Sequence, residues 1–483
     1  MSEVKKSKNP LMNDVFWYAL GTMIPMGINV VKTPIFTRHY TAEDYGYFGL
    51  VMGIFLYLST VCYSWLASCI WRYYNTFEQK NILHKFYSNL LFLYVVSSGI
   101  ILLSSLLFIT FYHEPFIVFK LIILCFLHFI LKELIGLFYV ILRVKGYAKS
   151  NNILSILQVA LSFILLIVCA FIFDFDITAL ISSSIIIDVF FVAGIVFYLI
   201  KTNKLKSISI DFVNSKYLKI YLNYGSFILL SSIVTLLIVS SDRYILALYD
   251  SIENVGIYTK VYDIAQISIT AFVFVFFNVI NPKMNKVLTA NVNTADTYIQ
   301  KYLFAYIFCL LPITFLISLY SKEISTLLLG EEFRTGHTIM PYVFFSAFIY
   351  GIVTFNQNKL KFKNKLKTIV FILTFCFIVN LILNFIVVPK LGYKGTAVTT
   401  LITYVLMLIL FFRKESFGFL KIKAFTQPII QQIIVLIVLY AIDLGVRKIV
   451  DFNITTAIIE GVIFLSILLI LFRNRIKKID LPV

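Results

Sequence analysis

The chain is a succession of long apolar stretches separated by short polar connections. Each stretch runs for about 18 to 27 residues, long enough at a rise of about 1.5 Å per residue for a helix to cross a hydrocarbon core of about 30 Å. We predict about fourteen membrane-spanning helices, at residues 14–36, 45–68, 88–112, 116–142, 150–172, 179–200, 221–242, 255–280, 302–320, 338–357, 368–388, 395–412, 428–446 and 454–472. The pattern predicts an all-α integral membrane protein, and a hydrophobic fraction of 60% leaves no soluble alternative.

Lys and Arg gather in every second connection between the predicted spans. If the N-terminus is cytoplasmic, the cytoplasmic segments hold most of the 42 Lys and Arg, as the positive-inside rule requires. We therefore expect a multi-pass protein of the bacterial inner membrane with both termini in the cytoplasm. The net charge of +18 then needs no nucleic-acid partner. The basic run at 359–367 is interpreted as a cytoplasmic anchor between two spans rather than a site for RNA or anionic lipid.

No pattern typical of covalent chemistry or metal binding stands out. The six cysteines fall within predicted spans without a C-x-x-C pair, the five histidines are scattered, and P-loop, G-x-S-x-G and H-E-x-x-H motifs are absent. The longest connections, 201–220 and 281–301, leave no room for an extramembrane catalytic domain. Glu43 and Asp44 resemble the acidic metal-binding pair of lipid-dependent glycosyltransferases, but the rest of that architecture is missing. We predict a transporter without a cofactor or resident metal, not an enzyme.

A short internal repeat divides the chain into two halves. The segment EDYGYF at 43–48 reappears as ENVGIY at 253–258, each copy just before a span that returns from outside. Because six spans separate the copies, the two halves share one orientation, as parallel repeats do. The predicted parts are an N-lobe at 1–200, a cytoplasmic linker at 201–220, a C-lobe at 221–412, and two added spans with a basic tail at 413–483.

Each copy of the repeat contains a glycine, Gly46 in the first and Gly256 in the second. We expect these glycines to form a tight entry turn with positive φ, which the missing Cβ permits.

Three stretches of the chain resemble a known family. They are NDVFWYALGTMIPMGINVVKTPIFTRHYTAEDYGYF from Asn13, DRYILALYDSIENVGIYTKVYDIAQ from Asp242 and NLILNFIVVPKLGYKGTAVTT from Asn380. Together they are similar to polysaccharide-exporting flippases of the Wzx type, in the multidrug/oligosaccharidyl-lipid/polysaccharide exporter (MOP) superfamily. The resemblance implies two lobes that alternate between inward-open and outward-open states around a central cavity.

The resemblance also implies a substrate and partners. The substrate is an undecaprenyl-pyrophosphate-linked oligosaccharide unit of a surface polysaccharide, such as O-antigen of lipopolysaccharide or capsule. Membrane lipids surround the protein, and a polysaccharide polymerase or chain-length machinery is the expected protein partner.

Ionisable side chains within the spans are candidates for function, because one near the bilayer centre costs about 2.5–3.5 kcal/mol on insertion scales. Lys132 and Asp188 are the deepest. His128 precedes Lys132 by one helical turn and shares its face, whereas the adjacent Glu133 points away. We therefore expect Lys132 to face another helix, water or substrate.

Two polar stripes lie on the first and eighth spans, which the resemblance implies line the cavity. On the first span Asn29 and Lys32 share a face around Pro25, the expected hinge. On the eighth span the stripe consists of Lys260, Asp263 and Gln266.

A basic cavity suits a pyrophosphate-bearing substrate, because Lys and Arg replace part of the hydration that the phosphates lose. The candidate substrate-binding residues are Asn29, Lys32, Arg38, His128, Lys132, Arg243, Lys260 and Gln266. Four of these residues lie near span ends: Lys32, Arg38, Arg243 and Lys260. The alternative for these four is that their side chains only extend to the membrane interface.

Three acidic residues within the spans, Asp188, Asp263 and Glu460, are candidates for binding a coupling proton or sodium ion. A carboxylate buried in a cavity binds a proton more readily than one in water and can change state between two conformations. The alternative is that these residues are static partners of the lysines.

These observations predict a flippase that moves a lipid-linked oligosaccharide from the cytoplasmic to the external leaflet by alternating access. A secondary antiporter that exports small organic cations is the alternative, and it would need an acidic, aromatic cavity. A membrane-embedded glycosyltransferase is a further alternative, and it would need a metal and a sugar donor.

Overall fold

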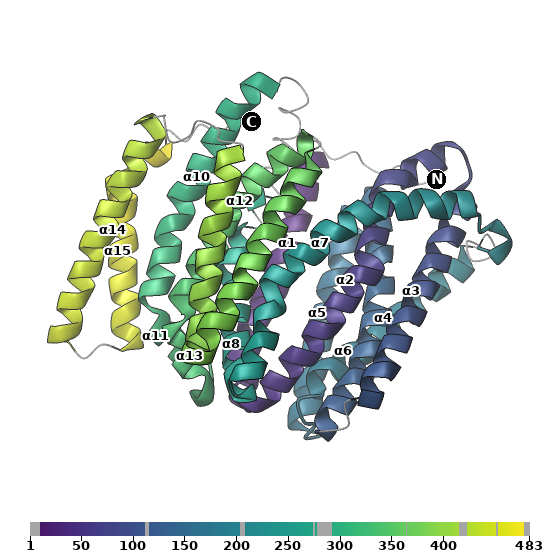
Figure 1. Cartoon of the computed structure of the whole chain (residues 1–483), viewed down its shortest axis with the longest axis horizontal. Helices are drawn as coiled ribbons and strands as arrows, with labels where there is room; N and C mark the ends of the chain where they lie inside the picture. The colour runs from purple at the N-terminus through teal and green to yellow at the C-terminus, as the bar shows by residue number, and fades with distance from the viewer. Residues whose placement is uncertain are drawn as a thin grey trace. The chain divides into compact units, whose positions relative to one another are not determined.

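A computed structural model describes residues 10–111, 115–202, 208–273, 276–277, 292–363, 365–414, 423–450 and 453–477. Within these ranges every regular element is a helix, as Figure 1 shows. The chain divides into two compact units. The first comprises Met1–Lys32 and Asp44–Ser240, and the second comprises Thr33–Glu43 and Ser241–Val483.

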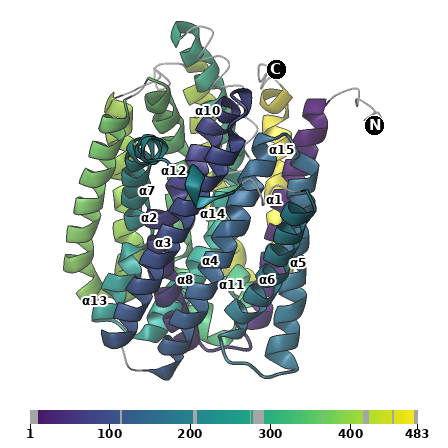
Figure 2. The ribbon, with the colours of Figure 1, turned by 90° about the vertical axis from the view of Figure 1, so that its right-hand side faces the viewer.

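The first unit is built from the helices of the N-terminal half. They are α1 (Pro10–Phe36) as far as Lys32, most of α2 (Ala42–Gln79), α3 (Leu83–Phe111), α4 (Phe116–Val144), α5 (Ala148–Phe171), α6 (Ala179–Lys201), the short 3₁₀ turn η2 (Ile210–Phe212), and α7 (Ser215–Tyr249) as far as Ser240. In Figures 1 and 2 helices α2 to α6 run roughly alongside one another, the first part of α7 lies across their ends, and α4 packs against both α5 and α6.

Residues in the left-handed backbone conformation follow the ends of two of these helices. Asn81, with φ of 55°, follows α2 and turns the chain into α3, and Gly146, with φ of 78°, separates α4 from α5. Asn and Gly are the residues that adopt this conformation most readily, and helices commonly end on them. The short connections therefore return the chain at once and place neighbouring helices antiparallel.

Interlocking aromatic side chains fill the core of the first unit. Tyr63 and Tyr74 from α2, Phe86 from α3, Phe129 from α4 and Tyr221 from α7 are all almost completely buried. In a membrane, close van der Waals packing rather than exclusion of water holds helices together. The aromatic core therefore fixes the relative positions of α2, α3 and α4.

The second unit is built from the helices of the C-terminal half. They are α8 (Ile252–Ala265), the π-helical turn η3 (Gln266–Thr270), α10 (Val292–Leu319), α11 (Ser321–Leu328), the 3₁₀ helix η4 (Glu331–Thr338), α12 (Met340–Phe362), α13 (Leu366–Lys414), α14 (Lys423–Ile449) and α15 (Ile454–Lys477). Within this unit α12 packs along α13, and α14 packs on α10 and on α15.

The 49-residue segment α13 is two helices joined at a sharp bend. Gly392 at the bend has φ of 53° and ψ of −141°, which lies outside the helical region. A continuous helix of this length would extend for about 74 Å, more than twice the thickness of the hydrocarbon core. The bend therefore separates the two spans predicted at 368–388 and 395–412.

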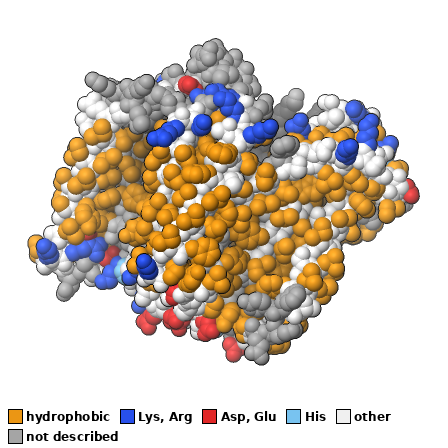
Figure 3. All heavy atoms as spheres, in the orientation of Figure 1, with side chains coloured by type: hydrophobic (Ala, Val, Ile, Leu, Met, Phe, Trp, Pro, Cys, Tyr) orange, Lys and Arg blue, Asp and Glu red, His pale blue; other side chains and the backbone are white. Residues whose placement is uncertain are grey.

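The described helices have the lengths and composition of membrane spans. Ten of them are long and apolar enough to cross a membrane, and the pair Glu331–Thr338 and Met340–Lys361, bent by 61°, raises the number to eleven. α13 is one of the ten and holds two predicted spans. Figure 3 shows hydrophobic side chains over the middle of the face, Lys and Arg along its upper edge and at its lower left, and Asp and Glu along its lower edge. The protein is an all-α integral membrane protein, as predicted.

Two of the sequence predictions need separate comment. Gly46 lies inside α2 and Gly256 inside α8, both in helical conformation, so the predicted positive-φ entry turn is wrong. Both glycines are buried in the first turns of their helices. The division between the compact units falls within α7, and the lobe boundaries expected from the repeat stay a prediction.

Candidate functional site

Four polar side chains from three helices form a hydrogen-bonded network inside the first unit. Asp188 of α6 is 2% exposed, and its carboxylate oxygens lie 3.1 Å from Nδ1 of His128 on α4 and 2.6 Å from Nε2 of Gln158 on α5. Gln158 accepts a hydrogen bond of 2.9 Å from the hydroxyl of Tyr139, which is also on α4. The carboxylate of Asp188 is thus held by a histidine and an amide.

Two lysines lie close to this network. Lys32 of α1 and Lys132 of α4 are both near enough to His128 for their charges to act on its ring. We call Lys32, His128 and Lys132 the basic cluster. The sequence predicted each of the three as a candidate, and the structure brings them together in the first unit.

Lys132 has the surroundings expected of a functional lysine. Its side chain is exposed, and its Nζ lies 5.4 Å from the centroid of the Phe129 ring. The neighbouring Glu133 turns to α2, where its carboxylate accepts a hydrogen bond of 2.6 Å from Ser59. Because an exposed ammonium in the middle of a span is costly in lipid, this position calls for water or a ligand beside Lys132.

The stripe on α1 lies along a continuous helix. Asn29 is exposed and Lys32 is half-buried, one turn apart on the same face. The helix runs through Pro25, whose ring removes one backbone hydrogen-bond donor and weakens the helix there. A role for Pro25 as a hinge stays a prediction.

Arg38 follows α1 and is bound to backbone. Its guanidinium donates to the carbonyl oxygens of Pro34, at 3.0 Å, and of Leu327 at the end of α11, at 2.9 Å. Nearby, the hydroxyl of Thr37 accepts a hydrogen bond of 3.0 Å from the backbone N–H of Gly330. These contacts fasten the turn after α1 to the second unit's own helices and give Arg38 a structural role.

The stripe predicted on the eighth span lies on α8. Nζ of Lys260 donates to Asp263 at 2.8 Å, and whether Asp263 binds a coupling ion or only pairs with this lysine stays a prediction. Gln266 begins the π-helical turn, and its side chain is outside the described part of the structure. Arg243 on α7 is half-buried, and its Nε has no hydrogen-bond partner among the described residues.

The second unit contains a buried acidic residue that the sequence did not single out. Asp242 of α7 is completely buried, and its Oδ2 accepts hydrogen bonds from the hydroxyls of Tyr258 and, at 3.1 Å, Thr400. Its Oδ1 has no hydrogen-bond partner within the part of the chain that is described. In the sequence Asp242 precedes Arg243 near a span end, so the two look like an ordinary interfacial pair.

Amide and hydroxyl groups of α13 extend this polar region. Asn384 receives a hydrogen bond from Thr399, the neighbour of Thr400, and donates to Oδ1 of Asn380 at 3.1 Å. Asn380 in turn donates to Thr403 at 3.0 Å, and all four side chains are buried. A spacing of four residues from Asn380 to Asn384, which places both amides on one helical face, is the signal that was available in the sequence.

The region around Asp242 and α13 contains carboxylate, amide and hydroxyl oxygens together with the amide nitrogens of Asn380 and Asn384. Hard cations bind oxygen ligands. One carboxylate supplies a single negative charge there, and the guanidinium of the next residue, Arg243, is near enough for its charge to act on that carboxylate. Among the described residues no three His, Cys, Asp or Glu side chains come close enough to hold a metal together.

Glu460 of α15 belongs to a separate charged group at the last two helices. Arg447 of α14 donates to Asp443 at 2.8 Å and to Glu323 of α11 at 2.8 Å. Glu460 is 8% exposed and lies close enough to Asp443 and Tyr320 to interact with both. This arrangement joins α14 to α11. Both carboxylate oxygens of Glu460 are buried without a hydrogen-bond partner among the described residues, so its role as a coupling residue stays a prediction.

Solved structures with the same fold are membrane transporters. The lipid II flippase MurJ in an inward-closed conformation is 17% identical, with a TM-score of 0.62 over 95% of this chain and 100% of that chain. A MATE-family multidrug resistance transporter of the MOP superfamily, inward-facing, is 13% identical, with a TM-score of 0.62 over 84% and 96% of the two chains. A MOP-superfamily transporter from Pyrococcus furiosus, titled for the reverse polarity of its binding pocket, is 15% identical, with a TM-score of 0.61 over 88% and 100%.

The fold is therefore that of the MOP superfamily of membrane flippases and transporters, as the sequence resemblance implied. A search of curated protein sequences finds no match. The sequence pattern described as "polysaccharide biosynthesis protein" matches residues 11–288, more than half of the chain. The chain belongs to this polysaccharide biosynthesis protein family.

Proposed function

We propose that the protein is a flippase for a lipid-linked oligosaccharide, which it moves from the cytoplasmic to the external leaflet of a bacterial inner membrane by alternating access. Its substrate class is an undecaprenyl-pyrophosphate-linked repeat unit of a surface polysaccharide. Membership of the polysaccharide biosynthesis family and the MOP fold support this assignment. Both termini lie in the cytoplasm, as the distribution of Lys and Arg favours.

The observation that carries the proposal is the basic cluster. Lys32 and Lys132 come from different helices, and the charges of both act on His128. Together they outnumber the single carboxylate of Asp188, which is bonded to His128, while Glu133 is engaged with Ser59. Charged hydrogen bonds from lysine are about twice as strong as neutral ones, so this cluster stabilises a pyrophosphate that has left water. The same cluster would repel an organic cation, which argues against the antiporter.

For the coupling ion, sodium or a proton, we propose Asp242 as the binding site in addition to the predicted candidates. The free Oδ1 of Asp242 and the hydroxyl of Thr400 support this role, because a buried carboxylate with a vacant lone pair is costly unless an ion or proton occupies it. The two other acidic candidates nearest the lysines, Asp188 and Asp263, already hold hydrogen-bond partners. Asp242→Asn is expected to remove the sodium dependence of transport, whereas Asp174→Asn, at an exposed position between α5 and α6, leaves it unchanged. Transport that follows pH instead of sodium would assign the site to a proton.

The oligosaccharide delivered to the outer leaflet is the substrate of a polysaccharide polymerase. That enzyme, or the machinery that sets chain length, is therefore the proposed partner. Neither partner is needed for the flipping step itself, since the protein makes and breaks no covalent bond.

Complementation tests this function. In a strain that lacks its own flippase and is supplied with the matching sugar genes, the wild-type chain is expected to restore surface polysaccharide. Lys132→Ala is expected to lower the amount about tenfold or more at equal protein level, as the loss of one charge-assisted hydrogen bond to phosphate does. Lys120→Ala is the matched control, because Lys120 lies on the same helix but pairs with Asp176 at the surface. Full restoration by Lys132→Ala would refute the role of the basic cluster.

A further inference from the structure

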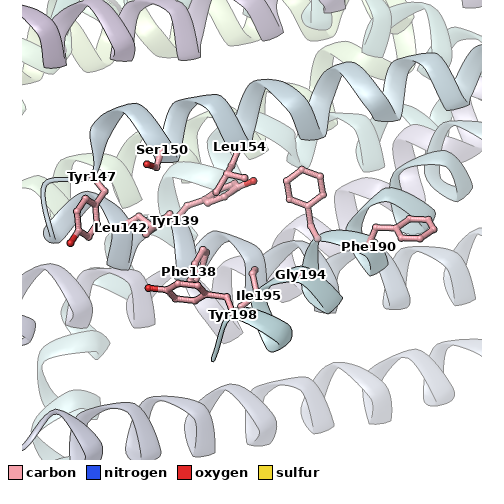
Figure 4. Close-up of a pocket in the computed structure, with 11 residues that line it drawn as sticks. Phe138, Tyr139, Leu142, Tyr147, Ser150, Leu154, Phe190, Gly194, Ile195 and Tyr198 are labelled. Carbon is pink, nitrogen blue, oxygen red and sulfur yellow. The ribbon is translucent and has the colours of Figure 1, made fainter. Parts of the chain in front are cut away.

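A cavity of about 610 Å³ opens between α4, α5 and α6 of the first unit. Figure 4 shows the side chains around it, with Tyr147 at one end and Phe190 at the other. Six of its lining residues are aromatic: Phe138, Tyr139, Tyr147, Phe190, Phe191 and Tyr198. A cavity of this size with mostly apolar and aromatic walls is typical of a ligand site.

The cavity opens to the surface of the bundle rather than into its core. Phe190 and Tyr147, which mark its two ends, are 69% and 57% exposed. Both lie on or beside helices that pass the length and hydropathy test for membrane spans. A ligand therefore enters the cavity sideways, from the lipid phase.

One end of the cavity is strongly basic. Arg143 in the last turn of α4 and Lys201 in the last turn of α6 lie near Tyr147 and Tyr198 along the chain. Lys145 and Lys149 follow close by, with their ammonium groups over the rings of Tyr74 and Trp17. The two segments that carry the cavity lining, 134–154 and 189–202, contain no acidic residue. The electrostatic potential at this end therefore favours an anion such as phosphate.

The cavity extends from this basic end toward the middle of the membrane. Phe190 precedes Lys201 by eleven residues of α6, about 16 Å along the helix axis. That distance is about half the thickness of the hydrocarbon core. The cavity therefore follows the course of a lipid tail whose phosphate stays at the interface.

We propose that this cavity binds the polyprenyl tail of the lipid carrier next to its phosphate, and that Arg143 and Lys201 hold the phosphate. The inference rests on the proposed function, because the carrier of the flippase substrate has a polyprenyl chain. An isoprenoid chain carries methyl branches and double bonds, so it presents more surface per unit length than a straight acyl chain. The broad aromatic walls supply the matching contact area.

Tyr139 connects the cavity with the polar network. Its ring lines the cavity, and its hydroxyl donates to Gln158, which donates to Asp188. Asp188 is in turn bonded to His128 of the basic cluster. A tail in the cavity therefore packs against the ring of Tyr139, whose hydroxyl belongs to the hydrogen-bonded network beside the basic cluster.

Gly194 in the cavity wall offers a variant that blocks the site. A Cβ at Gly194 would meet no atom within 4 Å, so Gly194→Leu fills the cavity without a clash in the fold. Gly99→Leu on α3 is the matched control, because a Cβ there is equally unobstructed and the residue lies outside the cavity. Gly194→Leu is expected to weaken binding of a polyprenyl chain about tenfold, since it displaces about two buried methylenes.

The experiment uses the full chain in nanodiscs and a photoreactive polyprenyl monophosphate. We expect the probe to label peptides from 138–154 and 190–198, Gly194→Leu to lose this labelling, and Gly99→Leu and excess phosphatidylglycerol to leave it unchanged. The proposal would be overturned by labelling elsewhere in the chain or by undiminished labelling of Gly194→Leu. It would also be overturned if phosphatidylglycerol competed as well as unlabelled polyprenyl phosphate, because the cavity would then be a crevice for lipids in general.

This experiment separates the tail site from the flippase function. A wild-type chain that restores surface polysaccharide but is not labelled at these peptides refutes the tail site alone. A chain that is labelled there but does not restore polysaccharide refutes the flippase function alone.

Discussion

Removing the hydrogen bond between Gln158 and Asp188 by mutation measures how much this bond contributes to the stability of the polar network. The three proteins to compare with wild type are Gln158→Ala, Asp188→Ala and the double variant. The bond is 2.6 Å long and its acceptor is 2% exposed. Hydrogen bonds to charged groups contribute about 1.5–3 kcal/mol in water-soluble proteins, while side-chain bonds between membrane helices average about 0.6 and reach about 1.7 kcal/mol. We expect a coupling energy of about 1–2 kcal/mol, because the bond is short, charged and buried.

The assay is the free energy of unfolding of each purified protein in mixed micelles, from which the coupling energy follows as a double-mutant cycle. Asp188→Ala alone is expected to be the more destabilising single change, since it also leaves His128 without its partner. Ser104→Ala is the control, because the exposed hydroxyl of Ser104 donates only to a carbonyl of its own helix. The changes in unfolding free energy caused by Ser104→Ala and Gln158→Ala must therefore be additive. A cycle energy below about 0.3 kcal/mol would refute the network.

Three further predictions concern single positions. Gly392→Ala is expected to lower the unfolding free energy by about 1–3 kcal/mol, because φ of 53° with ψ of −141° is strained for any residue with a Cβ; an unchanged melting temperature would show that the bend is not needed. Arg447→Met is expected to cost about 2–4 kcal/mol in the same measurement, since it leaves the carboxylates around it without their counter-charge, and a stable variant would contradict this. Burial alone raises the pKa of Asp176, but hydrogen bonds from Thr178 and Lys120 outweigh it and hold the pKa below its ordinary value. The carboxylate therefore contributes stability at neutral pH that is lost as the pH falls below about 3.9, so Asp176→Asn is expected to destabilise the protein at pH 7 but not in acid.

The helical fold could be predicted from hydrophobic length alone. Every predicted span that lies within the described residues falls on a helix, because a segment in lipid must satisfy its backbone internally. The exact ends were not predictable: α2 and α7 extend well beyond the spans at 45–68 and 221–242. Helix ends outside the hydrocarbon core depend on capping and tertiary packing, which hydropathy does not report. The conformation of Gly46 was missed for the same reason, since a buried glycine can serve close packing as well as a turn.

The candidate site was predicted by residue type and not by pairing. A lysine and an aspartate at mid-span stand out in any apolar sequence, so Lys132 and Asp188 were found. Their partners lie on other helices, and helical periodicity along one span says nothing about which face of a neighbour it meets. Asp242 was missed because its position near a span end looks interfacial, whereas the packing of α13 over it removes it from solvent.

The most direct test of the account is the movement of a lipid-linked oligosaccharide across a sealed bilayer by the purified protein. The rate is measured in proteoliposomes with a fluorescent headgroup that an impermeant quencher reaches only from outside. We predict rapid transfer by the wild-type chain, transfer at least about tenfold slower by Lys132→Ala, and wild-type rates for Lys120→Ala. Equal rates for protein-free and protein-containing vesicles, or for Lys132→Ala and wild type, would contradict a flippase that carries its substrate through the basic cluster.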